Sequence, residues 1–296
     1  MTILIPTHNR AEKVLNSIEY YQDFDCDFIY VDSSDTHLEV QLKNNIQYFH
    51  VPKMDFVSKV ILGIKKSRTD IISLCADDDL KAEDQFSLEC YRISSSNCIN
   101  VVIGNTMYFH ENFDGKIYGP KVVYEKFNDK SSLSQTISVA RYLPQILWAT
   151  YKKDFLLSAF ERIQSCEFSN ENFYELSLWV DALKKRGQIG YVEGIQTYRE
   201  LTESDHWGDT QAKVSLLRIF YQKSDIQALC WTHNTFFAYL KAMFFVLKYL
   251  LFGAVRSAKS KFSALLRNPD ERRYRRLRES SLEISKAVIE FLARKK

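Results

Sequence analysis

The chain has 296 residues, enough for one large domain or for a domain of about 200 residues with an appendage. Hydrophobic residues make up 46% and charged residues 26%, so the chain can bury a core and extensive disorder is excluded. The net charge of +3 is unevenly distributed: residues 256–296 hold 13 Lys and Arg against 5 Asp and Glu, and the residues before them hold 27 against 32. A mildly acidic body with a basic tail is not typical of a protein that coats nucleic acid.

Short apolar runs alternate with helical patterns at the start of the chain. Strands are predicted at Thr2–Pro6, Asp27–Val31, Ile46–Val51 and Ile71–Ala76. Helical or amphipathic segments are predicted between them, over Arg10–Tyr21, Thr36–Lys43 and Asp55–Ser67. This alternation is typical of βαβ units and predicts an α/β fold with a mostly parallel sheet flanked by helices.

The pattern is less regular in the rest of the chain. A helix over Asp84–Ser94, a strand over Ile99–Phe109 and a hairpin near Gly115 and Gly119 are predicted first. The segments predicted next are a helix-rich stretch from Ser131 interrupted at Pro144, a helix over Asn172–Lys185, and short edge strands at Gln188–Val192 and Ile195–Tyr198. From about Asp209 the sequence is helical in pattern almost to its end, which places a domain boundary there.

Cysteine and glycine usage excludes several kinds of site. The six cysteines form no C-x-x-C pair and no zinc-binding spacing, and residue 1 leads into an apolar strand without a basic, cleavable leader. Both features are typical of a protein in the reducing cytoplasm. The nine glycines form neither a P-loop (G-x-x-x-x-G-K-[ST]) nor a dinucleotide-binding loop (G-x-G-x-x-G). A phosphorylated ligand must therefore be held in another way.

Three adjacent acids, Asp77-Asp78-Asp79, follow the fourth predicted strand. Each carboxylate raises the pKa of the next unless a cation lies between them, and open α/β sheets bind ligands beyond the carboxyl ends of their strands. Hard cations such as Mg²⁺ and Mn²⁺ take oxygen ligands, often together with substrate phosphates. Position and chemistry favour a metal–diphosphate site; the alternative is an acidic N-cap for the next helix.

Polar residues also follow the first two predicted strands. Thr7-His8-Asn9-Arg10 comes after the first strand, and Asp32-Ser33-Ser34-Asp35 comes after the second. Each group alone is typical of a turn with a helix cap. Three polar strand ends in succession favour one shared pocket.

In this order and spacing, TILIPTHNR, FIYVDSSD and DIISLCADDDL resemble the nucleotide-sugar-binding half of the GT-A glycosyltransferases. The inverting family 2 enzymes of bacterial surface-polysaccharide synthesis are the most similar group. The resemblance is specific over residues 2–81 and looser up to 207. It implies a GT-A catalytic domain over residues 1–208, with a donor half (1–81) and an acceptor half (82–208), followed by a helical extension over 209–296.

The resemblance also implies roles for the strand-end residues. The donor would be contacted by Pro6, Thr7, His8, Asn9, Arg10 and Asp32, with Asp32 facing the nucleobase. The DxD element would fall on Asp77 and Asp79, which would bridge a Mn²⁺ or Mg²⁺ ion, the ribose and the diphosphate. A second register places the element on Asp78 and Asp79, so Asp79 is a predicted metal ligand in both.

An inverting sugar transfer needs a carboxylate that takes the proton from the acceptor hydroxyl. In the resembled family this base opens a helix, and the corresponding stretch here is Ser169–Leu176. Glu171 is the first candidate and Glu175, on the same helix face, is the second. The stretch departs from the family at Asn172, where an Asp is usual, and two solvated helix acids are the alternative interpretation.

Further along, the chain resembles the close of the catalytic domain, where a basic residue or a His approaches the diphosphate. Arg199 and His206 are therefore predicted to bind the donor, and His206 also to bind the metal. Trp207, Gln145 and Trp148 are predicted to line the acceptor site, and a place in the core is the alternative interpretation for Trp148.

The segment Thr235–Val255 is long and apolar enough to consider as a membrane span, but Lys241 and Lys248 share one helical face. This pattern is typical of a helix that lies in a membrane interface or packs against a partner. The basic run over residues 272–278 would attract anionic lipid. Peripheral contact with the inner face of the cell membrane, homo-oligomerisation and packing against the catalytic domain are the alternatives; nucleic-acid binding is not expected.

The sequence thus predicts a cytoplasmic, metal-dependent glycosyltransferase that moves a sugar from a nucleotide-diphosphate sugar to a glycan or lipid-linked acceptor. A sugar-nucleotide nucleotidyltransferase and a non-catalytic scaffold of the same fold are the alternatives. The first of these needs a glycine-rich loop after the first strand, where this chain has Pro6-Thr7-His8-Asn9.

Overall fold

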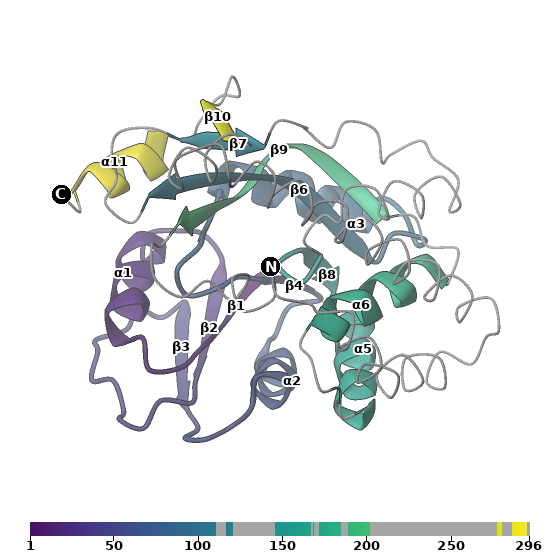
Figure 1. The fold of residues 1–296 in the computed structure, drawn as a ribbon, viewed down its shortest axis with the longest axis horizontal. Coiled ribbons are helices and arrows are strands. Elements are labelled where there is room, and N and C mark those ends of the chain that lie inside the picture. Colours follow the sequence, from purple (N-terminus) through teal and green to yellow (C-terminus); the bar gives the residue numbers. More distant parts are fainter. Residues whose placement is uncertain are drawn as a thin grey trace, which may run out of the picture.

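One mixed sheet carries the fold (Figure 1). The structure is a computed structural model that describes residues 1–110, 117–120, 146–166, 168, 172–184, 189–201, 277–279 and 286–294. The strands in the first third of the chain are β1 (Thr2–Thr7), β2 (Asp27–Asp32), β3 (Ile46–His50), β4 (Ile71–Leu74) and β5 (Leu80–Lys81). The later strands are β6 (Val101–His110), β7 (Tyr118–Pro120), β8 (Thr150–Lys152), β9 (Ile189–Leu201) and β10 (Leu277–Glu279).

The strand order within these residues is β10-β7-β6-β8-β4-β1-β2-β3, and β9 pairs with both β5 and β6. β1 is parallel to β2 and β4, and β2 is parallel to β3, whereas β8 is antiparallel to its neighbours β4 and β6. The helices are α1 (Ala11–Tyr21), α2 (Phe56–Lys66), α3 (Phe86–Ser94), α5 (Lys153–Cys166), α6 (Asn172–Lys184) and α11 (Lys286–Arg294), and a 3₁₀ turn covers Glu83–Gln85. The predicted α/β fold with flanking helices is confirmed. The described sheet is mixed: its first strands are parallel, as predicted for most of the sheet, whereas β7, β8 and β10 pair antiparallel with their neighbours.

Alternate residues of the parallel strands build two cores, because successive side chains of a strand point to opposite faces of the sheet. Leu4, Ile29 and Val31 pack with the apolar residues of α2, α5 and α6. Ile3 and Ile5, on the other face, pack with those of α1 and α11. The strands are thus fixed from both sides, so their carboxyl ends form a rigid edge.

Helix α2 is fixed at its start and along its length. The Asp55 carboxylate accepts the backbone N–H of Ser58 at 3.0 Å, which satisfies one of the free donors at the helix N-terminus. Gly63 lets the helix approach β1 closely, because a Cβ at this position would lie 2.1 Å from Leu4 Cδ1. Both features place the first turns of α2 beside the carboxyl ends of β1 and β2.

The connection between β2 and β3 differs from the prediction. Thr36–Lys43, predicted as an amphipathic segment between the strands, contains no helix. Leu38 and Val40 are partly buried against the core, and the Leu38 N–H donates to Tyr48 Oη at 3.3 Å. Leu38 and Val40 are two positions apart, so in an extended chain both point to the same side, toward the core. This packing determines the conformation here in place of the weak helical pattern.

The two short edge strands predicted around Gly194 are one long strand. β9 runs parallel to β6, with register shifts on both sides of Asn105. The Asn105 side-chain amide donates to the carbonyl oxygens of Glu193 and Gly194, which accommodates the irregularity. Because β9 pairs with β6 on one side and with β5 on the other, it lies inside the sheet. The pairing with β5 brings its carboxyl end beside the first 81 residues.

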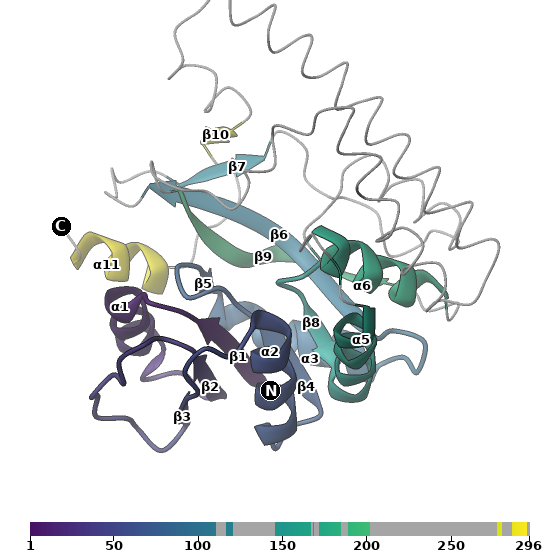
Figure 2. The ribbon, with the colours of Figure 1, turned by 60° about the horizontal axis from the view of Figure 1, so that its bottom comes forward.

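Two pieces of the basic tail are described. The tail was predicted to be helical almost to its end, but β10 pairs with β7 as a strand. Helix α11 buries Val288, Phe291 and Leu292 beside α1, and the Phe291 ring centroid lies 4.9 Å from that of Tyr20 (Figure 2). The last helix therefore packs on the helix α1 side of the sheet, and packing against the main domain was one of the three alternatives considered for the tail. The segment Thr235–Val255 and the stretch from Ser131 to Gln145 lie outside the described residues.

Candidate functional site

The carboxyl ends of β1, β2 and β4 meet at one corner of the sheet. Thr7 and Asp32, the last residues of β1 and β2, are paired in register. The Thr7 hydroxyl donates to Asp77 Oδ2 at 2.6 Å and so connects the first strand end to the acidic turn after β4. The three polar groups predicted to share one pocket are therefore in contact.

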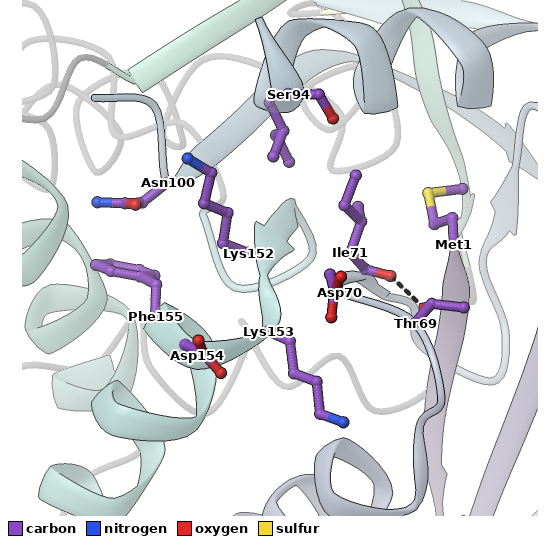
Figure 3. A pocket seen from close by; sticks show the side chains of 11 residues that line it. Met1, Thr69, Asp70, Ile71, Ser94, Asn100, Lys152, Lys153, Asp154 and Phe155 are labelled. Carbon is purple, nitrogen blue, oxygen red and sulfur yellow. Dashed lines mark hydrogen bonds between the residues drawn. The ribbon is translucent and has the colours of Figure 1, made fainter. Parts of the chain in front are cut away.

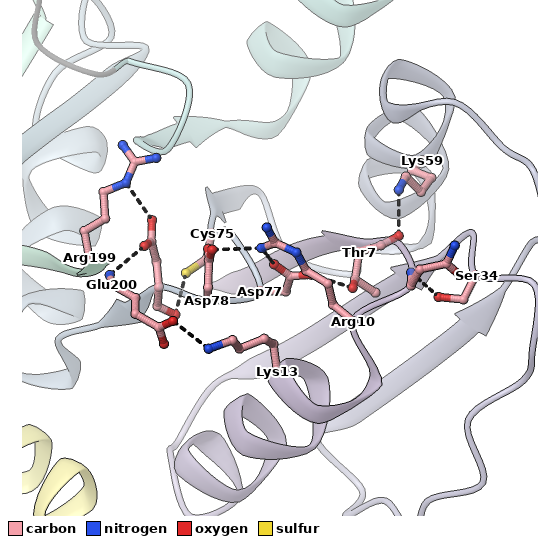
Figure 4. A network of polar contacts seen from close by, with 12 residues as sticks. Thr7, Arg10, Lys13, Ser34, Lys59, Cys75, Asp77, Asp78, Arg199 and Glu200 are labelled. Carbon is pink, nitrogen blue, oxygen red and sulfur yellow. Dashed lines mark hydrogen bonds and ion pairs between the residues drawn. The ribbon is translucent and has the colours of Figure 1, made fainter. Parts of the chain in front are cut away.

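Arg10 joins the first loop to the acidic turn. Its Nη1 lies 2.9 Å from Asp77 Oδ1 and 2.8 Å from Asp78 Oδ2 (Figure 4). Burial lowers the pKa of the guanidinium, but the two carboxylates more than reverse this effect and hold the pKa above its usual range. Arg10 thus supplies a positive charge between two adjacent acids whose mutual repulsion needs one.

Asp79 points the other way, toward the end of β9. Its Oδ1 accepts the backbone N–H of Glu200 at 3.3 Å, and its Oδ2 lies 3.8 Å from the Arg199 Nε. The side chain is 1% exposed, and Oδ2 accepts no hydrogen bond. Burial raises the pKa of Asp79 to about 7, against the opposing attraction of Arg199.

Asp32 is held by its neighbours at the end of β2. Its Oδ1 accepts the backbone N–H of Ser34 at 2.8 Å and also the Ser34 hydroxyl, while its Oδ2 accepts the Tyr48 hydroxyl at 2.5 Å. Burial on its own raises the pKa of Asp32, but these hydrogen bonds outweigh it and lower the pKa overall. Asp32 is therefore a fixed anion at the carboxyl edge.

The remaining residues of the first loop connect the strand ends. Pro6 is buried in β1, and the His8 Nδ1–H donates to the Ser33 carbonyl at 3.1 Å. Asn9 has a left-handed backbone conformation (φ 53°), and its N–H donates to Ser34 Oγ at 2.7 Å. Apart from Pro6, the predicted donor residues up to Asp78 thus belong to one hydrogen-bonded network.

The sequence analysis missed three charged groups of this network. Lys59, on α2, donates to the Thr7 carbonyl at 2.6 Å, and the Lys13 Nζ lies 2.6 Å from Glu200 Oε1 (Figure 4). Lys59 lies three residues after Phe56 and four before Gly63, hence on the packed face of α2, and a lysine at such a position could have drawn attention to it. Lys13 and Glu200 are 187 residues apart, and no sequence pattern connects them.

Two residues predicted for the acceptor half, Glu175 and Trp148, are connected by the loop 146–149: Glu175 contacts this loop, and Trp148 belongs to it. Glu175 Oε1 accepts the backbone N–H of Leu147 at 3.5 Å, and burial raises the pKa of its carboxyl. The Trp148 carbonyl accepts the buried Lys81 Nζ at 2.6 Å, and its half-buried ring packs against Phe56. The other predicted residues of this half, Glu171, Gln145, His206 and Trp207, lie outside the described residues.

The residues of the acidic turn differ in their capacity for a divalent cation. Both oxygens of Asp77 are already engaged, by Thr7 and Arg10. Asp79 has a buried oxygen without a hydrogen bond, which is costly unless a cation or donor completes it, and Asp78 is 22% exposed. Carboxylate oxygens suit Mg²⁺ or Mn²⁺, so Asp79 with Asp78 fits such an ion, although within the described ranges no three His, Cys, Asp or Glu side chains are grouped to hold one.

A separate hollow of about 600 Å³ lies at the opposite end of the sheet, lined by Met1, Asp70 and Lys152 among others (Figure 3). Its two lysines donate to backbone carbonyls, Lys152 to Ser96 and Lys153 to Ser67. Its lysines are therefore used by the fold, and the strand-end corner remains the candidate site. No helix in the described part of the chain is long and apolar enough to cross a membrane.

The chain matches no protein-family profile and no curated protein sequence. Its α/β sheet flanked by helices agrees with the predicted GT-A fold, and the structural likeness given next supports this assignment.

Crystal structures of TarS from S. aureus are among the solved structures that resemble this chain. TarS 1–349 in complex with UDP-GlcNAc matches with a TM-score of 0.50 and 13% identity, over 78% of this chain and 65% of that one. TarS 1–349 alone gives a TM-score of 0.44 at 14% identity, over 67% of this chain and 60% of that chain. The longer TarS structure gives 0.44 at 14% identity, and this chain spans 42% of it. At 13% identity the first of these matches shows the fold alone.

Proposed function

We propose that the chain is a glycosyltransferase that moves a sugar from a nucleotide-diphosphate sugar to an acceptor hydroxyl. The observation that carries the proposal is the meeting of Asp32 with the acidic turn Asp77–Asp79 at the carboxyl edge of a GT-A sheet. Open α/β sheets bind ligands at this edge. The TarS structure of the same fold was crystallised with UDP-GlcNAc, which supports a donor of this chemical class.

In this proposal different residues of the corner contact different parts of the donor. Asp32, fixed by Ser34 and Tyr48, would face the nucleoside. Arg10 and Arg199 would place positive charge beside the diphosphate, and Asp79 with Asp78 would hold Mn²⁺ or Mg²⁺. A divalent cation bound there supplies charge stabilisation to the leaving diphosphate.

The acceptor half would supply the base and the acceptor contacts. Glu171 is the proposed base, and it would take the proton of the acceptor hydroxyl as the sugar is transferred with inversion. The contact of Glu175 with the Leu147 N–H supports a different role for that residue, as an anchor of the loop that carries Trp148. A glycan or lipid-linked acceptor is proposed from the family resemblance and the basic tail.

Calorimetry with UDP and GDP, each with and without Mn²⁺, tests this function. We expect Mn²⁺-dependent binding of one nucleotide and its loss in Asp79→Asn. Asp154→Asn is the matched control, because Asp154 is an exposed acid at the opposite end of the sheet. Binding of neither nucleotide, or equal binding to both variants, would contradict the proposal.

A further inference from the structure

Lys59 is a buried lysine beneath the donor-binding corner. Its side chain is 5% exposed, and its Nζ donates to the Thr7 carbonyl at 2.6 Å and to the Ser33 hydroxyl at 3.0 Å. Thr7 ends β1 and Ser33 follows β2, so one ammonium group holds the two strand ends together. Figure 4 shows it above Thr7 in the view, on the side of the network away from Arg199.

A charge at this place needs a reason, because burying an ammonium group is costly unless it is well compensated. Both hydrogen-bond acceptors of Lys59 are neutral. The negative charges that act on it are Asp32, Asp77 and Asp55, and they only partly offset the effect of burial, which lowers its pKa. A methionine would fill the same volume without this cost, so packing alone does not explain the lysine.

The position of the charge suggests what it serves. Thr7 binds Asp77, and Ser33 adjoins Asp32, so Lys59 underlies both acids of the proposed donor site. A fixed positive charge in a weakly polar environment acts strongly on an anion that arrives above it. Unlike Arg10, which is 46% exposed and paired with carboxylates, Lys59 is not engaged by an acid at hydrogen-bond distance.

We propose that Lys59 is a positioning residue for the diphosphate of the donor: it fixes the loops after β1 and β2 in register and provides positive charge below the diphosphate. The inference rests on the proposed function. Lys59 does not contact the donor itself, because its Nζ is covered by the two loops that it joins.

Lys59→Met tests the charge. It keeps the length of the side chain, and replacing a buried charge with an apolar group is often neutral for stability, so we expect a melting temperature close to that of the wild type. Calorimetry in saturating Mn²⁺ should show UDP binding weakened about tenfold or more, while uridine, which lacks the diphosphate, changes less than about threefold. Lys65→Met, on the same helix but 58% exposed, is the matched control and should change neither affinity.

Amide hydrogen exchange without nucleotide tests whether Lys59 fixes the loops after β1 and β2. The Ser33 N–H donates to the Thr7 carbonyl at 3.2 Å, and the peptides that cover residues 1–10 and 27–36 should exchange faster in Lys59→Met than in Lys65→Met. Equal losses of UDP and uridine affinity would overturn the electrostatic role, and unchanged affinity with unchanged exchange would overturn the whole inference. If the wild type binds neither UDP nor GDP, the proposed function fails, and the exchange data alone then decide whether Lys59 holds the loops.

Discussion

Replacing Arg10 with glutamine should tighten the binding of Mn²⁺ to the nucleotide-free protein. The Arg10 guanidinium lies within 3 Å of carboxylate oxygens of both Asp77 and Asp78. It therefore competes with a divalent cation for these two carboxylates. Because the guanidinium is 46% exposed, each ion pair contributes only about 0.5–1 kcal/mol. Removing both should therefore favour the cation by about 1–2 kcal/mol, which is about 5- to 30-fold in Kd.

The assay is a titration of Mn²⁺ followed by electron paramagnetic resonance, which detects the free ion without requiring turnover. Arg68→Gln removes an exposed arginine beyond the far end of α2 and serves as the control for the change in net charge. UDP affinity should fall in Arg10→Gln and stay unchanged in Arg68→Gln, because only Arg10 lies beside the proposed diphosphate site. An unchanged or weaker affinity for Mn²⁺ in Arg10→Gln would refute the competition between Arg10 and the cation.

Three further predictions address other parts of the chain. Glu171→Gln should abolish sugar transfer but keep donor binding, because the proposed base is removed. Glu175→Gln should keep most of the turnover, because its side chain can still accept the Leu147 N–H. The reverse result in a transfer assay would make Glu175 the base. Iodoacetamide at pH 8 should label the exposed Cys98 rapidly and Cys75 very slowly, since burial raises the pKa of the Cys75 thiol to about 12; equal labelling rates by mass spectrometry would contradict this burial. Phe291→Ala should lower the free energy of unfolding by about 3 kcal/mol in urea titrations, and Ile289→Ala, at a 40% exposed position of the same helix, by much less; similar losses would mean that α11 does not pack on α1.

The parallel half of the fold could be predicted because its local patterns agree with its tertiary structure. Thr2–Thr7 and Asp27–Asp32 are short β-branched or aromatic runs bounded by polar turns, and Phe56–Lys66 repeats apolar residues at helical spacing. The length of β9 could not be predicted. Gly194 indicates a break locally, and only pairing with β6 and the hydrogen bonds from Asn105 carry the strand past it.

The acidic and polar groups of the site could be predicted from the ends of the strands, but their partners could not. Arg10 and Asp77 are 67 residues apart, and Lys59 and Thr7 are 52 apart, so each contact depends on how the strands are ordered in the sheet. The position of Asp79 adds a distinction that sequence alone left open. Both oxygens of Asp77 accept hydrogen bonds, from Thr7 and Arg10, whereas the buried Asp79 Oδ2 accepts none and has the Arg199 Nε at 3.8 Å. The geometry therefore favours Asp78 and Asp79 over Asp77 for the proposed cation.

We propose that the corner formed by β1, β2 and β4 transfers sugars from nucleotide-diphosphate donors. The release of free nucleoside diphosphate from a panel of nucleotide-sugars, with Mn²⁺ and after its removal by EDTA, measures this activity. We expect release from one class of donor that requires the metal, is lost in Asp79→Asn and is retained in Asp154→Asn. Release that is equal in Asp79→Asn, or no release from any donor in the panel, would show that this corner does not transfer sugars in the way proposed.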